Sequence, residues 1–216
     1  MESLALLRLM AWLSPGFPTG AYAYSHGLEW AVAAGDVAAA NSLLVWLEDL
    51  LRHGSGRNDA ILLRQAYRAS IDPSRLAEIG ELAAALAPSR ERHAEALNIG
   101  QAFIGAAAAW SRPELPQKIT YPVAVGVLAA RNNIPEDTIA LAYLQAFVAN
   151  LISAAVRLVP LGQTTGLCAL ATIEPTILEV ALATREAGLA DIGGCTWRAD
   201  LAAMRHETQY TRLFRS

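Results

Sequence analysis

Residues 139–156 read IALAYLQAFVANLISAAV and contain no charged side chain over 18 positions. A run of this length lies at the lower limit for a membrane-spanning helix. Gln145, Asn150 and Ser153 interrupt it, and no excess of Lys and Arg marks one flank over the other. Because a helix that is apolar on all sides is otherwise found in the core of a larger protein, the stretch predicts a buried central helix, over residues 135–158, rather than a membrane span.

The rest of the chain shows apolar residues spaced by three and four, and alternating apolar and polar residues are hard to find. Residues 37–53 give the clearest case, with leucines at positions 43, 44, 47, 50 and 51. The sequence therefore predicts an all-α fold, a single-domain bundle of about ten helices over residues 1–216. The other expected helices are one before Ser14 and those over 57–70, 75–86, 90–110, 121–132, 167–173, 175–188 and 200–210.

Composition excludes several classes of function. The chain is 54% hydrophobic and 17% charged, with a formal net charge of −3, so it has no basic stripe for nucleic acid. Cys168 and Cys195 stand apart and outside any CxxC spacing, which argues against a disulfide framework or a zinc site. The N-terminus lacks the features of a secretory signal. We expect a cytoplasmic protein, and its surplus of apolar residues must be placed in a buried central helix, a partner interface or a membrane.

The stretch SPGFPTGAYAYSHGLEWAVAAG, Ser14–Gly35, places Ser25, His26 and Glu29 within five positions. If Thr19 caps a helix, as its place before Gly-Ala suggests, the three side chains lie within about one turn. Neighbouring residues on a helix diverge by about 100°, so proton transfer between Ser25 and His26 would be poorly aligned. The local pattern does not favour a catalytic triad.

His26 and Glu29 could share a divalent ion, either within one chain or across two chains, because the i, i+3 spacing puts them on one face. Two ligands alone make a weak site, since stable metal centres use three or four. Hydrogen bonding at a helix contact is the favoured interpretation of this pair.

Phe17 lies between Pro15 and Pro18, and glycines at 16 and 20 allow sharp turns on either side. The ring is therefore held on a stiff corner that ends the first helix. Such a ring is either a plug in the core or a contact for a partner, and the residues alone leave both open.

The stretch VRLVPLGQTTG, residues 156–166, contains a glycine turn but no GxxxxGK[ST] motif, so a phosphate-binding loop is not indicated. We expect a helix that is broken at Pro160 and restarts past Gly162. In this interpretation Gln163 bonds to the free backbone groups of the break.

The last stretch, residues 204–216, reads MRHETQYTRLFRS. Three aromatic or apolar side chains alternate there with three arginines, a mixture enriched at protein interfaces. They are Tyr210, Leu213 and Phe214 with Arg205, Arg212 and Arg215. Docking on its own domain and docking on a partner are both open, and the second is favoured.

These three stretches, in this order, resemble the UreF family of urease accessory proteins, and WLEDLL, SRERHAEALNIGQAF and YPVAVG also look like family positions. The resemblance covers nearly the whole chain. One departure is Leu167, where family members often have a glutamine. The matching positions are Pro15, Phe17, Pro18, Gly20, Tyr22, Tyr24, Ser25, His26, Gly27 and Glu29; Arg157, Pro160, Leu161, Gly162 and Gln163; and Arg205, His206, Glu207, Tyr210, Arg212, Leu213, Phe214 and Ser216.

The resemblance implies a non-enzymatic homodimer that binds the accessory protein UreD, also called UreH. Together they would recruit the nickel-carrying GTPase UreG, act on apo-urease and couple GTP hydrolysis to nickel insertion. No cofactor of its own is implied, with nickel at most in transit, and neither nucleic acid nor a membrane is a partner. The alternative is a stand-alone nickel carrier that uses His26 and Glu29 across a dimer.

The resemblance also assigns roles to residues. Partner binding is expected at Phe17, Pro18, Tyr22, Tyr24, Ser25, His26, Glu29, Arg205, His206, Glu207, Tyr210, Arg212, Leu213 and Phe214. Pro160, Gly162 and Gln163 are expected to form a structural loop. We expect the C-terminal interaction tail, residues 205–216, to be loose in the isolated chain and ordered on a UreD-like partner.

Overall fold

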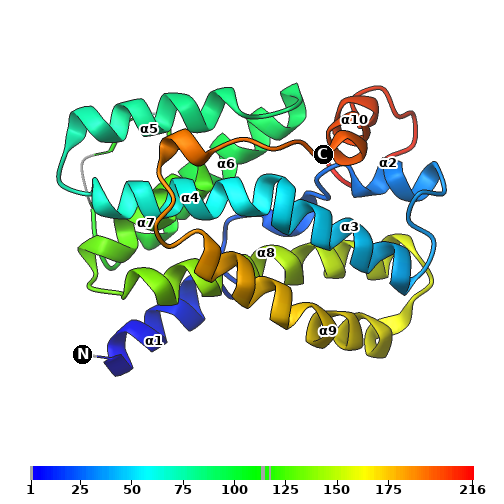
Figure 1. Ribbon diagram of the computed structural model, residues 1–216, viewed down its shortest axis with the longest axis horizontal. Coiled ribbons are helices and arrows are strands. Elements are labelled where there is room, and N and C mark those ends of the chain that lie inside the picture. Colours follow the sequence, from blue (N-terminus) through cyan, green and yellow to red (C-terminus); the bar gives the residue numbers. More distant parts are fainter. Residues whose placement is uncertain (1, 113–114, 117) are drawn as a thin grey trace.

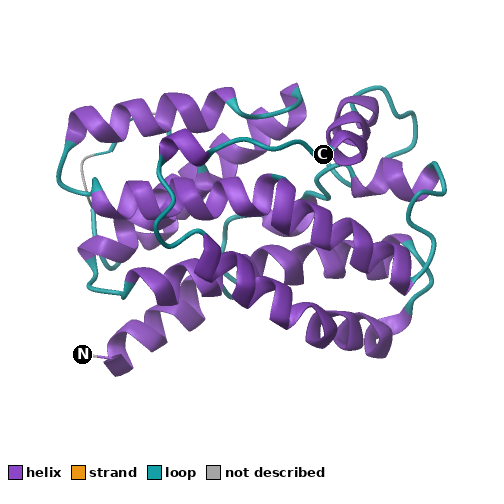
Figure 2. Ribbon diagram, in the orientation of Figure 1, coloured by secondary structure: helices purple, strands orange, loops and turns teal. Residues whose placement is uncertain are grey.

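The computed structural model describes residues 2–112, 115–116 and 118–216, and within these ranges it contains helices and no strand, which confirms the all-α prediction (Figures 1 and 2). The α-helices are α1 Glu2–Trp12, α2 Leu28–Ala33, α3 Ala40–His53, α4 Ser55–Arg68, α5 Pro73–Ala85, α6 Arg90–Ala107, α7 Tyr121–Arg131, α8 Glu136–Leu158, α9 Gly162–Ala183 and α10 Trp197–His206. Short 3₁₀ turns occupy Ala21–Ala23 and Leu189–Asp191.

Helix α8 joins the two halves of the hydrophobic core. Its first turns, including Ile139 and Tyr143, belong to a cluster formed with α1, α4, α5, α6 and α7. From Leu144 to Ala155 its buried side chains belong to a second cluster, formed with α2, α3, α9 and α10. The neutral run in the sequence is thus a core helix that packs against neighbours from both ends of the chain (Figure 1).

Helices α8 and α9 are each long and apolar enough to cross a membrane by length and composition. The core helix of a soluble protein meets the same two criteria, and α8 and α9 pack against each other along the bundle. Packing in the bundle buries 56% of the apolar stretch of α8 and 39% of that of α9, so α9 keeps exposed apolar residues such as Leu178 and Leu182.

Close approach of helices depends on two glycines. A Cβ on Gly126 of α7 would lie 2.2 Å from the carbonyl oxygen of Leu63 in α4, and one on Gly100 of α6 would lie 2.2 Å from that of Ile119. No other residue fits there without moving a backbone.

Two expected boundaries are wrong. The helices predicted over 167–173 and 175–188 are one continuous helix, α9, with Pro175 inside it. Pro175 is exposed, while Ile173 and Ile177 on either side of it are buried, so packing on α8 outweighs the missing backbone donor. The last helix begins at Trp197 and ends at His206, earlier than the predicted 200–210.

Candidate protein interaction site

The corner that follows α1 does not lead into a helix at Thr19, as the capping pattern predicted. Gly20 has a φ of 74° and precedes a 3₁₀ turn, and α2 begins only at Leu28, after Gly27 with a φ of 78°. A Cβ on Gly27 would lie 2.6 Å from the backbone nitrogen of Ala203. This glycine therefore permits both the sharp turn and the close packing of α10 on the corner.

Phe17 is half-buried and packs its ring against the edge of the core. Its ring centroid lies 5.6 Å from that of Phe103 and 6.2 Å from that of Trp110, and it packs against the cluster around α7. Pro18 beside it is exposed. The ring is thus held by aromatic packing within the chain, and its expected role in partner binding stays a prediction.

Glu29 receives the C-terminal segment. Its two carboxylate oxygens accept hydrogen bonds from the backbone amides of Leu213, at 2.6 Å, and Phe214, at 2.9 Å. One of them also lies 3.2 Å from Nε2 of His206, whose side chain is fully buried. A buried carboxylate with three partners is a strong fixing point for a chain end.

His206 bridges two carboxylates. Its Nδ1 atom lies 2.6 Å from a carboxylate oxygen of Glu91, opposite the contact with Glu29. The imidazole ring of His206 therefore lies between two carboxylates, one at each ring nitrogen. Arg212 donates to the other oxygen of Glu91 at 2.5 Å. Glu207, next in the chain, accepts from the backbone amide of Arg90 at 2.6 Å and so caps α6.

The chain end is tied to the corner as well. The backbone amide and the hydroxyl of Ser25 both donate to the carbonyl oxygen of Ser216, at 2.8 Å and 2.5 Å. The Ser216 hydroxyl donates to Glu95, and the amide of Arg215 donates to the carbonyl of Ala23 at 2.8 Å. The expectation of a loose tail is therefore wrong for this structure, because the tail forms backbone and ion-pair contacts with its own chain.

The second stretch meets the other two through Arg157. Its guanidinium carbon lies 4.4 Å from the ring centroid of Phe214, and it donates to the carbonyl oxygen of Tyr22 at 2.9 Å. The three stretches singled out in the sequence thus converge at the end of the bundle where the C-terminus lies beside α2 and α10 (Figure 1).

The polar residues of the corner divide between two networks. His26 contacts Glu95 at 2.7 Å, whereas Glu29 contacts His206 and the tail, so His26 and Glu29 share no partner. Burial and the nearby Arg92 lower the pKa of His26. Burial alone would raise the pKa of Glu95, but Arg92 and His26 outweigh it and hold that pKa at about 2.

This arrangement does not support catalysis or metal binding by the local cluster. The Ser25 hydroxyl is committed to the carbonyl of Ser216 and makes no bond to His26. Across the part of the chain that the structure describes, no group of three or more His, Cys, Asp or Glu is placed to hold a metal ion.

The second stretch forms a structural break, with Gly162 at a φ of 73° and α9 starting there. Pro160 is exposed. Gln163 is also exposed and its side chain bonds to no described residue, so the expected capping of free backbone groups by Gln163 is wrong. Leu167, one turn further along α9, points to solvent.

The tail leaves one face uncovered. Of the residues assigned to partner binding, the structure exposes Pro18, Tyr22, Arg205, Tyr210, Arg212 and Leu213, and buries wholly or in part Phe17, Tyr24, Ser25, His26, Glu29, His206, Glu207 and Phe214. Of the second set, Ser25 and Glu29 bind the tail directly, and the exposed side chains of the first set remain available to contact another molecule. Sequence reasoning missed Glu91 and Glu95, because a charged first turn on α6 looks solvent-exposed.

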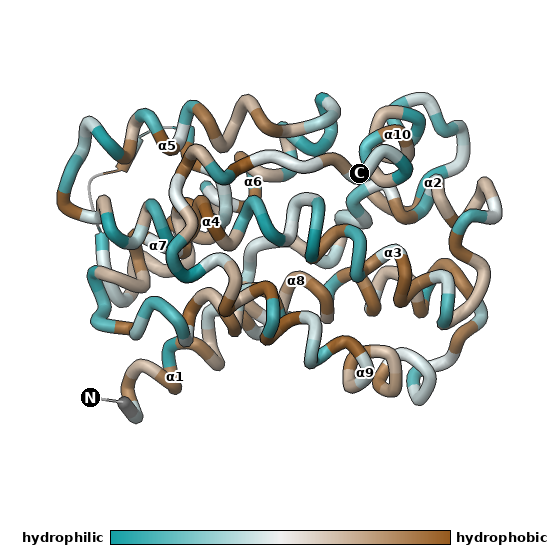
Figure 3. The backbone as a smooth tube through the Cα atoms, viewed as in Figure 1, coloured by the Kyte–Doolittle hydropathy of each residue, from teal (hydrophilic) through white to brown (hydrophobic). Residues whose placement is uncertain are grey.

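An apolar groove of about 860 Å³ runs along α1, α8 and α9 and reaches the corner and α6, where Tyr22, His26, Arg92 and Glu95 line it. Leu6 and Met10 of α1 and Leu178 of α9 stand exposed along it. The backbones of α1 and α9 run through the lower part of Figure 3. On its floor the hydroxyl of Tyr143 donates to Asp59 at 2.8 Å. Burial raises the pKa of Asp59 to about 6, although this hydrogen bond opposes the rise.

Comparison with known proteins bears on the family. The family model for UreF matches residues 37–174. The chain is 51% identical to the urease accessory protein UreF of Rhodopseudomonas palustris strain BisA53, over 98% of this chain and 93% of that protein. It is 51% identical to that of Mesorhizobium japonicum, over 100% and 98%, and 52% identical to that of Bradyrhizobium sp. strain BTAi1, over 100% and 94%. This chain belongs to the UreF family of urease accessory proteins.

Proposed function

We propose that this chain is a non-catalytic adaptor of urease maturation, and that its α10-tail face binds a UreD-like accessory protein. We define this face as the exposed side chains of Trp197, Leu201, Met204, Tyr210 and Leu213. In the proposed assembly the chain also recruits a UreG-like GTPase, and the complex acts on apo-urease so that GTP hydrolysis drives nickel insertion. We expect the assembly to form in the cytoplasm.

One observation supports this proposal above the others. Trp197, Leu201 and Met204 follow one another at i, i+4 and i+7 on α10 and are 73%, 50% and 48% exposed. A helix normally turns such a stripe inward, but here the inner side of α10 is already packed on α2 and α6. An apolar stripe that remains outside is characteristic of a protein contact.

The tail extends the same face. Glu29 holds its backbone and Glu91 holds the side chain of Arg212, while Tyr210 and Leu213 project away from the body of the chain. A partner would therefore meet a preformed surface, with little ordering cost on binding.

We further propose that the groove between α1, α8 and α9 is the face through which two copies of the chain dimerise. Apolar side chains of α1, α8 and α9 form part of its lining, and a second copy would bring the same helices to it around a twofold axis. Burial of Leu6, Met10 and Leu178 would remove a further exposed apolar surface from water.

Copurification tests the adaptor proposal. A tagged chain is coexpressed with a UreD-like protein, a UreG-like GTPase and apo-urease, and urease activation is scored with and without it. We expect a stable complex and a loss of activation when the chain is omitted. A complex that does not form, or activation that does not need the chain, would refute the adaptor proposal.

The dimer is tested separately. Met10→Asp with Leu178→Asp is expected to shift the mass measured by sedimentation from two chains to one.

A further inference from the structure

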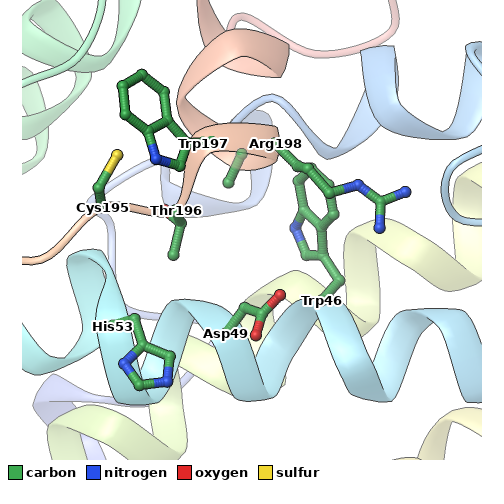
Figure 4. Close-up of a pocket in the computed structure, with 8 residues that line it drawn as sticks. Trp46, Asp49, His53, Cys195, Thr196, Trp197 and Arg198 are labelled. Carbon is green, nitrogen blue, oxygen red and sulfur yellow. The ribbon is translucent and has the colours of Figure 1, made fainter.

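A second pocket lies on a different side of α10, between α3 and the loop that leads into α10. It has a volume of about 250 Å³, and its lining includes Trp46, Asp49, His53, Cys195, Trp197 and Arg198 (Figure 4). Indole rings stand at two of its sides and a carboxylate rises from its floor (Figure 4).

The pocket is built on a close helix-loop contact. A Cβ on Gly194 would lie 2.5 Å from the carbonyl oxygen of His53, and one on Gly54 would lie 2.8 Å from the side chain of Thr196. The loop is therefore pressed against the end of α3 at both positions. Such packing fixes the pocket wall before any ligand arrives.

Trp46 contributes an unused hydrogen-bond donor. Its side chain is only 5% exposed, and its Nε1 atom has no hydrogen-bond partner among the described residues. The nitrogen is turned toward the space above Asp49 (Figure 4). A buried indole N–H normally has an acceptor, so an occupant of the pocket should bring one.

The charges around the pocket favour a cation. Arg198 is paired with Asp36 at 2.9 Å, whereas Asp49 has neither a salt bridge nor a side-chain hydrogen bond to a described residue. Asp200 accepts only long contacts from Cys195 and Thr196, at 3.6 Å and 3.5 Å. Of these two acids only Asp49 lines the pocket, so the pocket offers one carboxylate that no cation of the described chain neutralises.

We propose that this pocket binds an arginine or lysine side chain of a partner protein. The cation would stack on the exposed ring of Trp197 and pair with the Asp49 carboxylate. A backbone carbonyl of the same partner segment would accept from Trp46 Nε1. Because Trp197 also belongs to the α10-tail face, the pocket would anchor one edge of that interface, and in this respect the inference rests on the proposed function.

A small probe tests the pocket without any partner protein. The ¹⁵N-labelled full chain is titrated with arginine blocked at both ends, and the indole N–H signals of Trp46 and Trp197 are followed. Blocked citrulline, which has the same shape without the charge, is the control ligand. We expect saturable shifts of both indole signals at millimolar arginine and clearly weaker shifts with citrulline, because only arginine can pair with Asp49.

Variants sharpen the test. Asp49→Asn should raise the half-saturating concentration about threefold or more, and Trp197→Ala should raise it by a similar factor or abolish the shift of Trp46. Glu81→Gln, an exposed acid on α5, should change nothing. Equal shifts with citrulline, an unchanged response in Asp49→Asn, or no indole shift at all would overturn the pocket assignment. The complex with the accessory protein is measured separately, so failure here leaves the adaptor proposal to its own test.

Discussion

The carboxylate of Glu29 holds the backbone amide of Phe214 at 2.9 Å across 185 positions of sequence. This contact places the front corner of the chain and its C-terminal segment in one structural unit. It also explains why Phe214 is buried under Arg157 while its neighbour Leu213 remains exposed. The tail is therefore an ordered part of the protein surface.

Glu29→Gln should release the tail. A glutamine keeps one acceptor oxygen, but it removes the charge that faces His206 and one of the two amide contacts. We expect hydrogen exchange at Leu213 and Phe214 to accelerate by about tenfold or more, the equivalent of about 1.4 kcal/mol of lost protection. Unchanged exchange at these amides, measured by NMR or mass spectrometry, would show that Glu29 does not hold the tail.

Gly126→Ala should destabilise the whole bundle. The added Cβ would sit 2.2 Å from the carbonyl of Leu63, so α4 and α7 would have to separate, at a cost of about 2 kcal/mol or more. Gly105→Ala is the matched control, because its Cβ meets nothing within 4 Å in α6, and it should stabilise by about 0.5–1 kcal/mol. Chemical denaturation measures both, and equal effects of the two changes would contradict the packing described.

Asp59 makes the stability depend on pH. Its pKa lies near 6 in the folded chain and at the ordinary 3.8 when unfolded, so between about pH 4 and pH 6 the folded state holds more protons. The free energy of unfolding should therefore fall as pH rises through this window, and the loss is complete above about pH 6.

Asp59→Asn removes that titration while keeping an acceptor for the Tyr143 hydroxyl. The variant should be more stable than the parent by roughly 3 kcal/mol at pH 7.5 and by little at pH 4. Urea denaturation at a series of pH values measures the difference, with Glu81→Gln as an exposed control. A stability difference that stays constant with pH would show that Asp59 does not titrate in this window.

The helical bundle and its central helix could be predicted because both depend on local patterns. The uncharged residues 139–156 and the leucine spacing of residues 37–53 indicate from the sequence alone which helices have buried faces. Prolines are a less reliable guide to the ends of helices, since Pro175 lies inside α9, where packing on α8 stabilises the helix.

The site could be found only in outline. The sequence indicates the three stretches that form the site but does not show that they converge. Their convergence depends on the left-handed backbone conformation of Gly27 and on the hydrogen bond between Phe214 and Glu29, which are 185 positions apart. Charged Glu91 gave no signal, because nothing local shows that it faces His206 and Arg212. Ion pairs between residues that are far apart in the sequence leave no periodic pattern from which they could be predicted.

Disruption of the α10-tail face gives the most direct test of the account. The double change Leu201→Asp and Met204→Asp puts two charges on the exposed stripe and leaves the buried side of α10 untouched. We expect the variant to fold, with parental helicity and melting temperature, and to lose capture of the UreD-like protein by at least about a hundredfold. Undiminished capture by a folded variant would contradict the claim that this face binds the partner.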